Sequence, residues 1–209
     1  MIAGLAALGV ASLAARGWGK RLDHLLFRRL NDRRGPAADA FFGGVTELGS
    51  IWTSAGATVV LSTVGRRRQA LDALGAAGAT WAVGQALKRV YARPRPYQAF
   101  GDSRLLVPEP RGAAWPSTHP AVLLAFLTVA TWNLDTARAV RVVAGGVAGT
   151  VALSRVYLGV HFPSDVVGGL LLGRAVADAW AALVTPRVLA RVGPDGRSRS
   201  APKESAPVQ

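Results

Sequence analysis

Three short polar segments carry the side chains of this chain that could hold an anion and transfer protons. The first is the stretch KRVYARPRP at positions 88–96. Lys88 offers a point charge, and an arginine such as Arg95 offers a planar fork of N–H donors that suits phosphate oxygens. The segment therefore predicts an anion-binding strip. The alternative is a basic flank that anchors the end of a membrane helix.

The second segment, WPSTHP at positions 115–120, has the features of a helix start. Ser117 is a natural N-cap, and Pro120 fits the first helical turn. The free N–H groups and the positive dipole end of such a helix form an anion site, and His119 places a titratable group beside it. The alternative is an ordinary capped helix with a histidine at the membrane interface.

The third segment is SRVYLGVHFPSD at positions 154–165. Pro163 predicts a helix start, so His161 precedes the helix and Asp165 lies in its first turn. A carboxylate four residues on can accept a hydrogen bond from one imidazole N–H, which fixes the tautomer and raises the basicity of the other nitrogen. Arg155 would end the preceding span and face the same opening. The alternative is a purely structural His–Asp cap.

The elements that position these segments are long apolar blocks. The chain has 209 residues, of which 50% are hydrophobic and 18% charged, with a mean hydropathy of +0.26. Blocks of this length can cross a bilayer as helices, so we predict an all-α, polytopic membrane helix bundle. Five spans are expected at residues 37–64, 70–87, 117–133, 139–158 and 163–184, after a short N-terminal membrane segment.

The remaining segments set the expected boundaries. Residues 1–36 are predicted to contain the short membrane segment and a basic amphipathic helix in the interface plane, or a solvated connecting helix instead. Residues 37–185 form the membrane core, and residues 186–209 a disordered basic tail. If the spans alternate across the bilayer, the three polar segments fall on one side and can line one pocket.

The net charge of +13 admits nucleic acid, anionic lipid or a phosphorylated substrate as partner. The basic residues sit at the ends of apolar blocks, which favours lipid and argues against nucleic acid. The sequence has no cysteine, no HExxH motif and no carboxylate cluster, so we predict no metal and no cofactor.

Four side chains outside these arguments carry separate expectations. Arg93 is expected to contribute surface charge rather than to bind substrate. Glu47 lies inside an apolar block, where a carboxylate is either functional or part of a helix-packing hydrogen bond. Arg174 and Asp178 are spaced i, i+4 and are expected to form a structural pair.

In order and spacing, the three segments resemble the motifs of the type 2 phosphatidic acid phosphatases, which share a core with vanadium-dependent haloperoxidases. The K-x6-R-P motif matches Lys88, Arg95 and Pro96; P-S-G-H matches Pro116, Ser117 and His119, with Thr118 in place of glycine; S-R-x5-H-x3-D matches Ser154, Arg155, His161 and Asp165. The resemblance covers roughly residues 40–185.

The resemblance implies a role for each matched residue. His161 would be the nucleophile that forms a phosphohistidine, with Asp165 orienting it. His119 would protonate the leaving oxygen and then activate water. The residues implied as phosphate ligands are Lys88, Arg95 and Arg155, assisted by Ser117 and the amide of Thr118.

The implied function is a metal-independent membrane lipid phosphatase that acts on a polyprenyl phosphate or diphosphate. Phosphatidylglycerophosphate or phosphatidate is the alternative substrate, vanadate-dependent peroxidation an alternative reaction, and a non-catalytic lipid-phosphate binder or transporter the alternative of another class. We expect a bacterial-type plasma membrane. If the first segment spans, the basic loop at residues 66–68 lies inside and the site on the extracytoplasmic side, although the basic segment at residues 16–34 would then lie outside; if it does not span, the side stays open.

Overall fold

A computed structural model describes residues 19–32 and 35–190, together with Gly9. The described residues contain helices and no strand, which agrees with the predicted all-α class. The elements are α2 (Lys20–Asn31), α3 (Pro36–Val45), the 3₁₀ turn η1 (Thr46–Gly49), α4 (Ile51–Thr63), α5 (Arg67–Tyr91), α6 (Pro96–Ala99), α7 (Thr118–Asn133), α8 (Arg138–Tyr157), α9 (Pro163–Leu183) and α10 (Thr185–Leu189).

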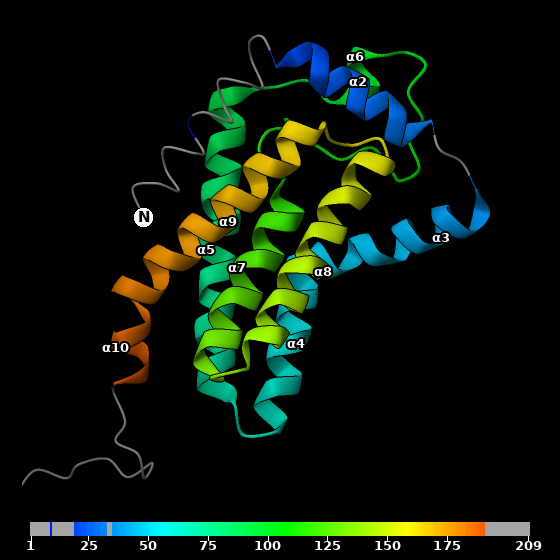
Figure 1. Ribbon diagram of the computed structural model, residues 1–209. Coiled ribbons are helices and arrows are strands. Elements are labelled where there is room, and N and C mark those ends of the chain that lie inside the picture. The colour runs from blue at the N-terminus through cyan, green and yellow to red at the C-terminus, as the bar shows by residue number, and fades with distance from the viewer. Residues whose placement is uncertain (1–8, 10–18, 33–34, 191–209) are drawn as a thin grey trace, which may run out of the picture.

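Helix α7 is the centre of the bundle, with α5, α8 and α9 packed around it (Figure 1). Its buried face includes Val122, Phe126 and Val129, which meet small residues of α5 such as Ala73 and Ala77. Small side chains let helix backbones approach closely, which is how helices associate where lipid removes the hydrophobic driving force. The three surrounding helices thereby hold α7 in place.

The predicted continuous span at residues 37–64 is wrong. The segment divides into α3 and α4, which run in different directions on either side of η1 (Figure 1). Ser50 causes the break: its backbone is extended, with ψ of 143°, and its hydroxyl accepts a hydrogen bond from the N–H of Trp52. This is a local N-cap, so α4 starts afresh at Ile51.

Two of the described helices, α8 and α9, are long and apolar enough to cross a membrane by length and composition. Helix α7, with 16 residues, is shorter, and α5 carries charged residues near both ends. The outer surface nevertheless presents many large apolar side chains, as expected where lipid is the solvent. They include Trp52, Val59, Val60, Trp81, Val142, Val143 and Val167, exposed by between 46% and 81%.

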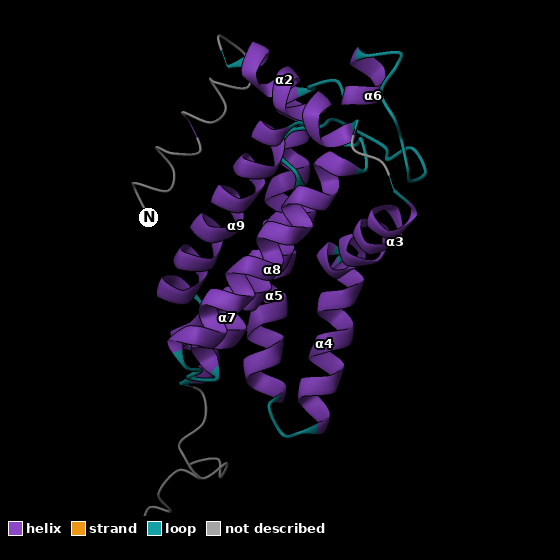
Figure 2. Ribbon diagram, turned by 45° about the vertical axis from the view of Figure 1, so that its right-hand side comes forward, coloured by secondary structure: helices purple, strands orange, loops and turns teal. Residues whose placement is uncertain are grey.

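Helix α2 crosses one end of the bundle, over the connection that contains α6 (Figure 2). The predicted helix at this position is confirmed, and two of its faces differ in what they contact. One face buries Asp23, Phe27 and Asn31 against the protein. Another leaves Leu22 and Leu25 exposed by 60% and 50%. The face of α2 that packs on the bundle is therefore partly polar, which the sequence analysis did not predict.

A buried carboxylate stabilises the opposite end of the bundle. Asp72 of α5 is only 2% exposed and accepts hydrogen bonds from Asn133 Nδ2 at 2.9 Å, Trp180 Nε1 at 2.9 Å and Thr185 Oγ1 at 2.6 Å. These bonds tie α5 to α7, α9 and α10. The predicted N-terminal membrane segment and the residues of the predicted tail beyond Ala190 lie outside the described residues.

Candidate active site

The three polar segments meet at the end of the bundle that α2 covers. Main-chain hydrogen bonds connect them: Ser117 N–H donates to the carbonyl of Asp165 at 2.9 Å, and Ala114 N–H donates to that of Arg93 at 2.8 Å. Arg95 Nη1 donates to the carbonyl of Val160 at 3.0 Å. The structure therefore brings together, in one site, segments that are far apart in the sequence.

The site buries more positive than negative charge. The side chains of the three motif cations, Lys88, Arg95 and Arg155, are 9%, 2% and 5% exposed. The motifs contain one carboxylate, that of Asp165, and it is 0% exposed. A buried charge is costly unless it is paired, so an excess of buried cations favours an anionic partner.

His161 lies at the centre of this charge and is 2% exposed. Its Nε2 is 3.3 Å from Arg95 Nη1, and its Nδ1 is 3.6 Å from Asp165 Oδ2. Burial is the main reason why the pKa of His161 lies well below the ordinary 6.5, and the charges of Lys88 and Arg155 lower it further. The imidazole is therefore neutral at neutral pH, with a lone pair available for attack.

Asp165 is fixed from two directions. Its Oδ2 accepts from the backbone N–H of Phe162 at 2.8 Å, across the start of α9, and its Oδ1 accepts from Arg93 Nη1 at 2.6 Å. The separation of 3.6 Å from His161 Nδ1 is too long for a hydrogen bond. Such contacts are often long before substrate binds and shorten during the reaction.

Arg95 donates hydrogen bonds to backbone carbonyls as well as contributing its charge to the site. Its guanidinium donates to the carbonyls of Gly112 and Val160, each at 3.0 Å, and lies 3.4 Å from the carbonyls of Arg111 and Ala113. Arg95 therefore fastens the connection after α6 to the loop that carries the nucleophile candidate, and it places its positive charge beside His161 Nε2.

Several polar atoms of the site have no protein partner within the described residues. They are Ser117 Oγ, Arg155 Nε and His161 Nδ1. Ser117 occupies the N-cap position of α7 as predicted, but its hydroxyl does not cap the helix. Arg155 uses one nitrogen on Thr46 Oγ1, at 2.8 Å. The free donors suit the several acceptor oxygens of a phosphate group.

Two glycines leave room for the second segment. A Cβ on Gly49 of η1 would lie 2.8 Å from His119 Cβ, and a Cβ on Gly84 of α5 would lie 2.6 Å from Thr118 Cγ2. The η1 turn therefore presses directly against His119. The methyl group of Thr118, which stands where glycine was expected, occupies the space that Gly84 leaves open.

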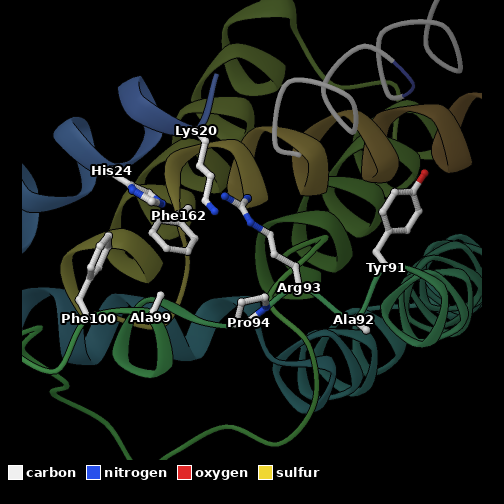
Figure 3. Close-up of a pocket in the computed structure, with 9 residues that line it drawn as sticks. All are labelled: Lys20, His24, Tyr91, Ala92, Arg93, Pro94, Ala99, Phe100 and Phe162. Atoms are coloured by element: carbon white, nitrogen blue, oxygen red, sulfur yellow. The ribbon is translucent and has the colours of Figure 1, made fainter. Parts of the chain in front are cut away.

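Two cavities open beside the site. One, of about 570 Å³, is lined by Lys88 together with Gln85 and Arg89. The other, of about 350 Å³, receives the side chains of Lys20 and His24 from α2 and of Arg93 from the connection after α5 (Figure 3). No group of three or more His, Cys, Asp or Glu side chains lies together within the described residues in a way that could hold a metal ion.

The expectation that Arg93 is a surface charge is wrong. Arg93 is 11% exposed and contacts two carboxylates, those of Asp165 and Asp23, each at 2.6 Å. Asp23 was missed altogether, although its i, i+4 spacing from Phe27 within a basic helix was a usable signal. Glu47 has an exposed carboxylate, and its carbonyl accepts from Thr53 Oγ1 at 2.6 Å.

The predicted pair in α9 is present, with Arg174 Nε 2.8 Å from Asp178 Oδ1 on the exposed side of the helix. The pair lies several turns from the three motif segments. It therefore belongs to the helix surface and not to the site.

Comparison with known proteins identifies the family. The model of the PAP2 superfamily matches residues 69–188, which include all three motif segments. The chain belongs to the PAP2 superfamily. The match starts near the beginning of α5, so α2, α3 and α4 precede the matched region.

Individual PAP2 relatives agree with this assignment. Undecaprenyl-diphosphatase of Sulfolobus acidocaldarius is 35% identical over 91 residues, which are 44% of this chain and 43% of that protein. The match thus spans less than half the length of this curated relative.

Two solved structures have the same fold. One is a transmembrane PAP2 type phosphatidylglycerolphosphate phosphatase from Bacillus subtilis, with a TM-score of 0.77, 23% identity, and coverage of 87% of this chain and 94% of that chain. The other is LpxE of Aquifex aeolicus, with a TM-score of 0.69, 27% identity, and coverage of 77% and 95%. The similarity to a transmembrane protein, together with the length and apolar composition of α8 and α9, supports the assignment of this chain as a membrane protein.

Proposed function

We propose that this PAP2 protein is a membrane lipid phosphatase that works through a phosphohistidine and needs no metal. One observation carries the proposal: a neutral, buried His161 lies among three buried cations, beside donors that have no partner in the part of the chain that the structure describes. A phosphate group would satisfy the free donors and neutralise the excess charge. Preorganised donors of this kind stabilise the charge that develops during phosphoryl transfer.

The proposed reaction has two steps. The Nε2 lone pair of His161 attacks phosphorus, an N–P bond forms, and the bond to the leaving oxygen breaks as His119 donates its proton to that oxygen. Asp165 stabilises the charge on the imidazole through Nδ1–H. Water then attacks phosphorus, His119 accepts the proton from water, and the N–P bond breaks to release phosphate.

Bound substrate prepares His119 for its first role. The phosphate brings negative charge to the start of α7, and negative charge nearby favours a protonated imidazole. Lys88, Arg95 and Arg155 hold the phosphate oxygens in this scheme, assisted by Ser117 Oγ and the N–H of Thr118 at the α7 N-terminus.

A polyprenyl diphosphate or monophosphate is the substrate class we favour. The undecaprenyl-diphosphatase relative supports it at 35% identity. The site lies at one end of a bundle whose sides carry exposed apolar side chains, so a lipid tail can stay in the bilayer while its phosphate enters the site. We also propose that the site faces the extracytoplasmic side of a plasma membrane, because the basic α4–α5 turn lies at the opposite end.

The test is phosphate release by detergent-purified protein in the presence of EDTA. The panel contains polyprenyl diphosphate, polyprenyl monophosphate, phosphatidate and phosphatidylglycerophosphate. We expect release that survives EDTA and disappears in His161→Ala. If folded protein releases phosphate from none of these lipids yet still binds them, the chain is a binder or transporter and the proposal fails. Halide oxidation with added vanadate would point to peroxidation instead.

A further inference from the structure

Helix α2 reaches the catalytic residues although it precedes the part of the chain that matches the family. It crosses the end of the bundle at which the three segments meet (Figures 1 and 2). Its buried residues Asp23, Phe27 and Asn31 are four apart and share one face. Phe27 packs with Phe162, the residue between His161 and the start of α9, with ring centroids 5.5 Å apart.

Asp23 caps helix α9 from a distance. The N-cap position of α9 is Phe162, whose side chain cannot accept a hydrogen bond. Asp23 Oδ1 instead accepts from Ser164 N–H at 2.8 Å, and Oδ2 accepts from Ser164 Oγ at 2.6 Å. A carboxylate at this place satisfies an unpaired donor and opposes the positive end of the helix dipole.

The same carboxylate holds Arg93. Asp23 Oδ2 accepts from Arg93 Nη2 at 2.6 Å, while Arg93 Nη1 donates to Asp165 Oδ1 at 2.6 Å and to Ser164 Oγ at 2.7 Å. The guanidinium carbon lies 4.5 Å from the centre of the Phe162 ring. Arg93 is thus a planar bridge between two carboxylates, with its rotation fixed at both ends.

We propose that Asp23 is a positioning residue of the active site. It holds Arg93, and Arg93 in turn fixes the carboxylate of Asp165. Asp165 Oδ1 accepts from Arg93 and Oδ2 accepts from the N–H of Phe162. These two hydrogen bonds fix the orientation of the carboxylate, with Oδ2 facing His161 Nδ1. Helix α2 is therefore part of the catalytic unit. The inference rests on the proposed function, since orientation of His161 matters for turnover only if it is the nucleophile.

The decisive variant is Asp23→Asn. Its side-chain carbonyl can still accept from Ser164 N–H, so the cap of α9 is kept, but Arg93 loses one of its two carboxylate partners. Partners that act through a ligand or a catalytic group typically change activity by about 10–100-fold. We expect kcat to fall by about that factor while KM changes by less than about threefold, because the phosphate-binding residues are untouched.

Two control variants separate positioning from the docking of α2. Asp102→Asn removes the exposed ion pair that Arg28 of α2 makes at 3.1 Å, which involves neither Arg93 nor Asp165. Asn31→Ala removes the hydrogen bonds from the buried Asn31 Nδ2 to the carbonyls of Arg104 and Tyr157, at 2.8 and 3.0 Å. We expect kcat of both controls to stay within about twofold of the parent. If Asn31→Ala lowers kcat as much as Asp23→Asn does, Asp23 only docks the helix and the inference is overturned.

A readout without substrate keeps this test independent of the proposed function. The chain has 3 histidines, so ¹⁵N-histidine NMR in detergent can resolve His161. In the parent we expect the Nδ1–H tautomer, which Asp165 favours, and in Asp23→Asn a shift toward a tautomer mixture. If the parent has no phosphatase activity but Asp23→Asn still shows the tautomer shift, the proposed function is refuted and the positioning role of Asp23 stands. An active parent whose variant keeps both tautomer and kcat would refute the positioning.

Discussion

The contact between Gly84 of α5 and Thr118 of α7 offers the sharpest test of the packing at the site. A Cβ on residue 84 would lie 2.6 Å from Thr118 Cγ2, whereas carbon atoms in ordinary contact are about 3.5–4.0 Å apart. Gly84→Ala therefore forces the two helices apart by about 1 Å at the start of α7. Overpacking of this kind costs about 1–3 kcal/mol.

The helical glycine Gly78 provides a matched control in the same helix. A Cβ there would meet nothing within 4 Å, so Gly78→Ala changes only the backbone preference, which favours alanine by about 0.5–1 kcal/mol. We expect Gly84→Ala to be less stable than Gly78→Ala by about 1–3 kcal/mol. Thermal unfolding in one detergent, followed by circular dichroism, measures the difference.

Thr118→Ser should rescue the overpacked variant, because serine lacks the methyl group that collides. The next atoms around the added Cβ are Leu172 Cδ2 at 3.8 Å and Thr118 Cβ at 3.9 Å, which are ordinary contacts. The double-mutant cycle should therefore give a favourable coupling of about 1–3 kcal/mol. Equal stabilities of Gly84→Ala and Gly78→Ala, or a coupling near zero, would refute this account of why threonine is accepted here.

Three further predictions concern the reaction and the opposite end of the bundle. His119→Ala should form labelled phosphoenzyme from a substrate with a good leaving group and hydrolyse it slowly, whereas His161→Ala should form none; label on His161→Ala would refute His161 as the nucleophile. Because the pKa of His161 is lowered, acid protonates it only below 6.5, so its ¹⁵N shifts should remain those of a neutral ring as pH falls to that value; a midpoint at or above 6.5 would contradict the burial argument. Asp72→Ala should destabilise the fold by about 3 kcal/mol through three lost hydrogen bonds yet leave KM unchanged, which unfolding and kinetic assays can separate.

Local signals in the sequence were sufficient for most of the helix positions. Pro163 starts α9, Ser117 precedes α7, and the apolar block at residues 139–158 becomes α8. Hydropathy failed at residues 37–64 because the break at Ser50 depends on one local cap and on packing. An apolar block indicates how much apolar surface must be buried away from water, but not whether the backbone turns within the block.

What the sequence determined by itself was the chemistry of the site. The order and spacing of His161 and Asp165, with the basic residues around them, follow from local geometry and can be read along the chain. Only the tertiary structure decided which residues distant in the sequence contact the site. Asp23 lies 142 positions from Asp165 in the chain (165 − 23) and meets it only through Arg93, after α2 has packed across the bundle. The spacing of Asp23 and Phe27 can indicate a shared helix face but not the partner that meets it, because a buried ion pair depends on where two helices cross.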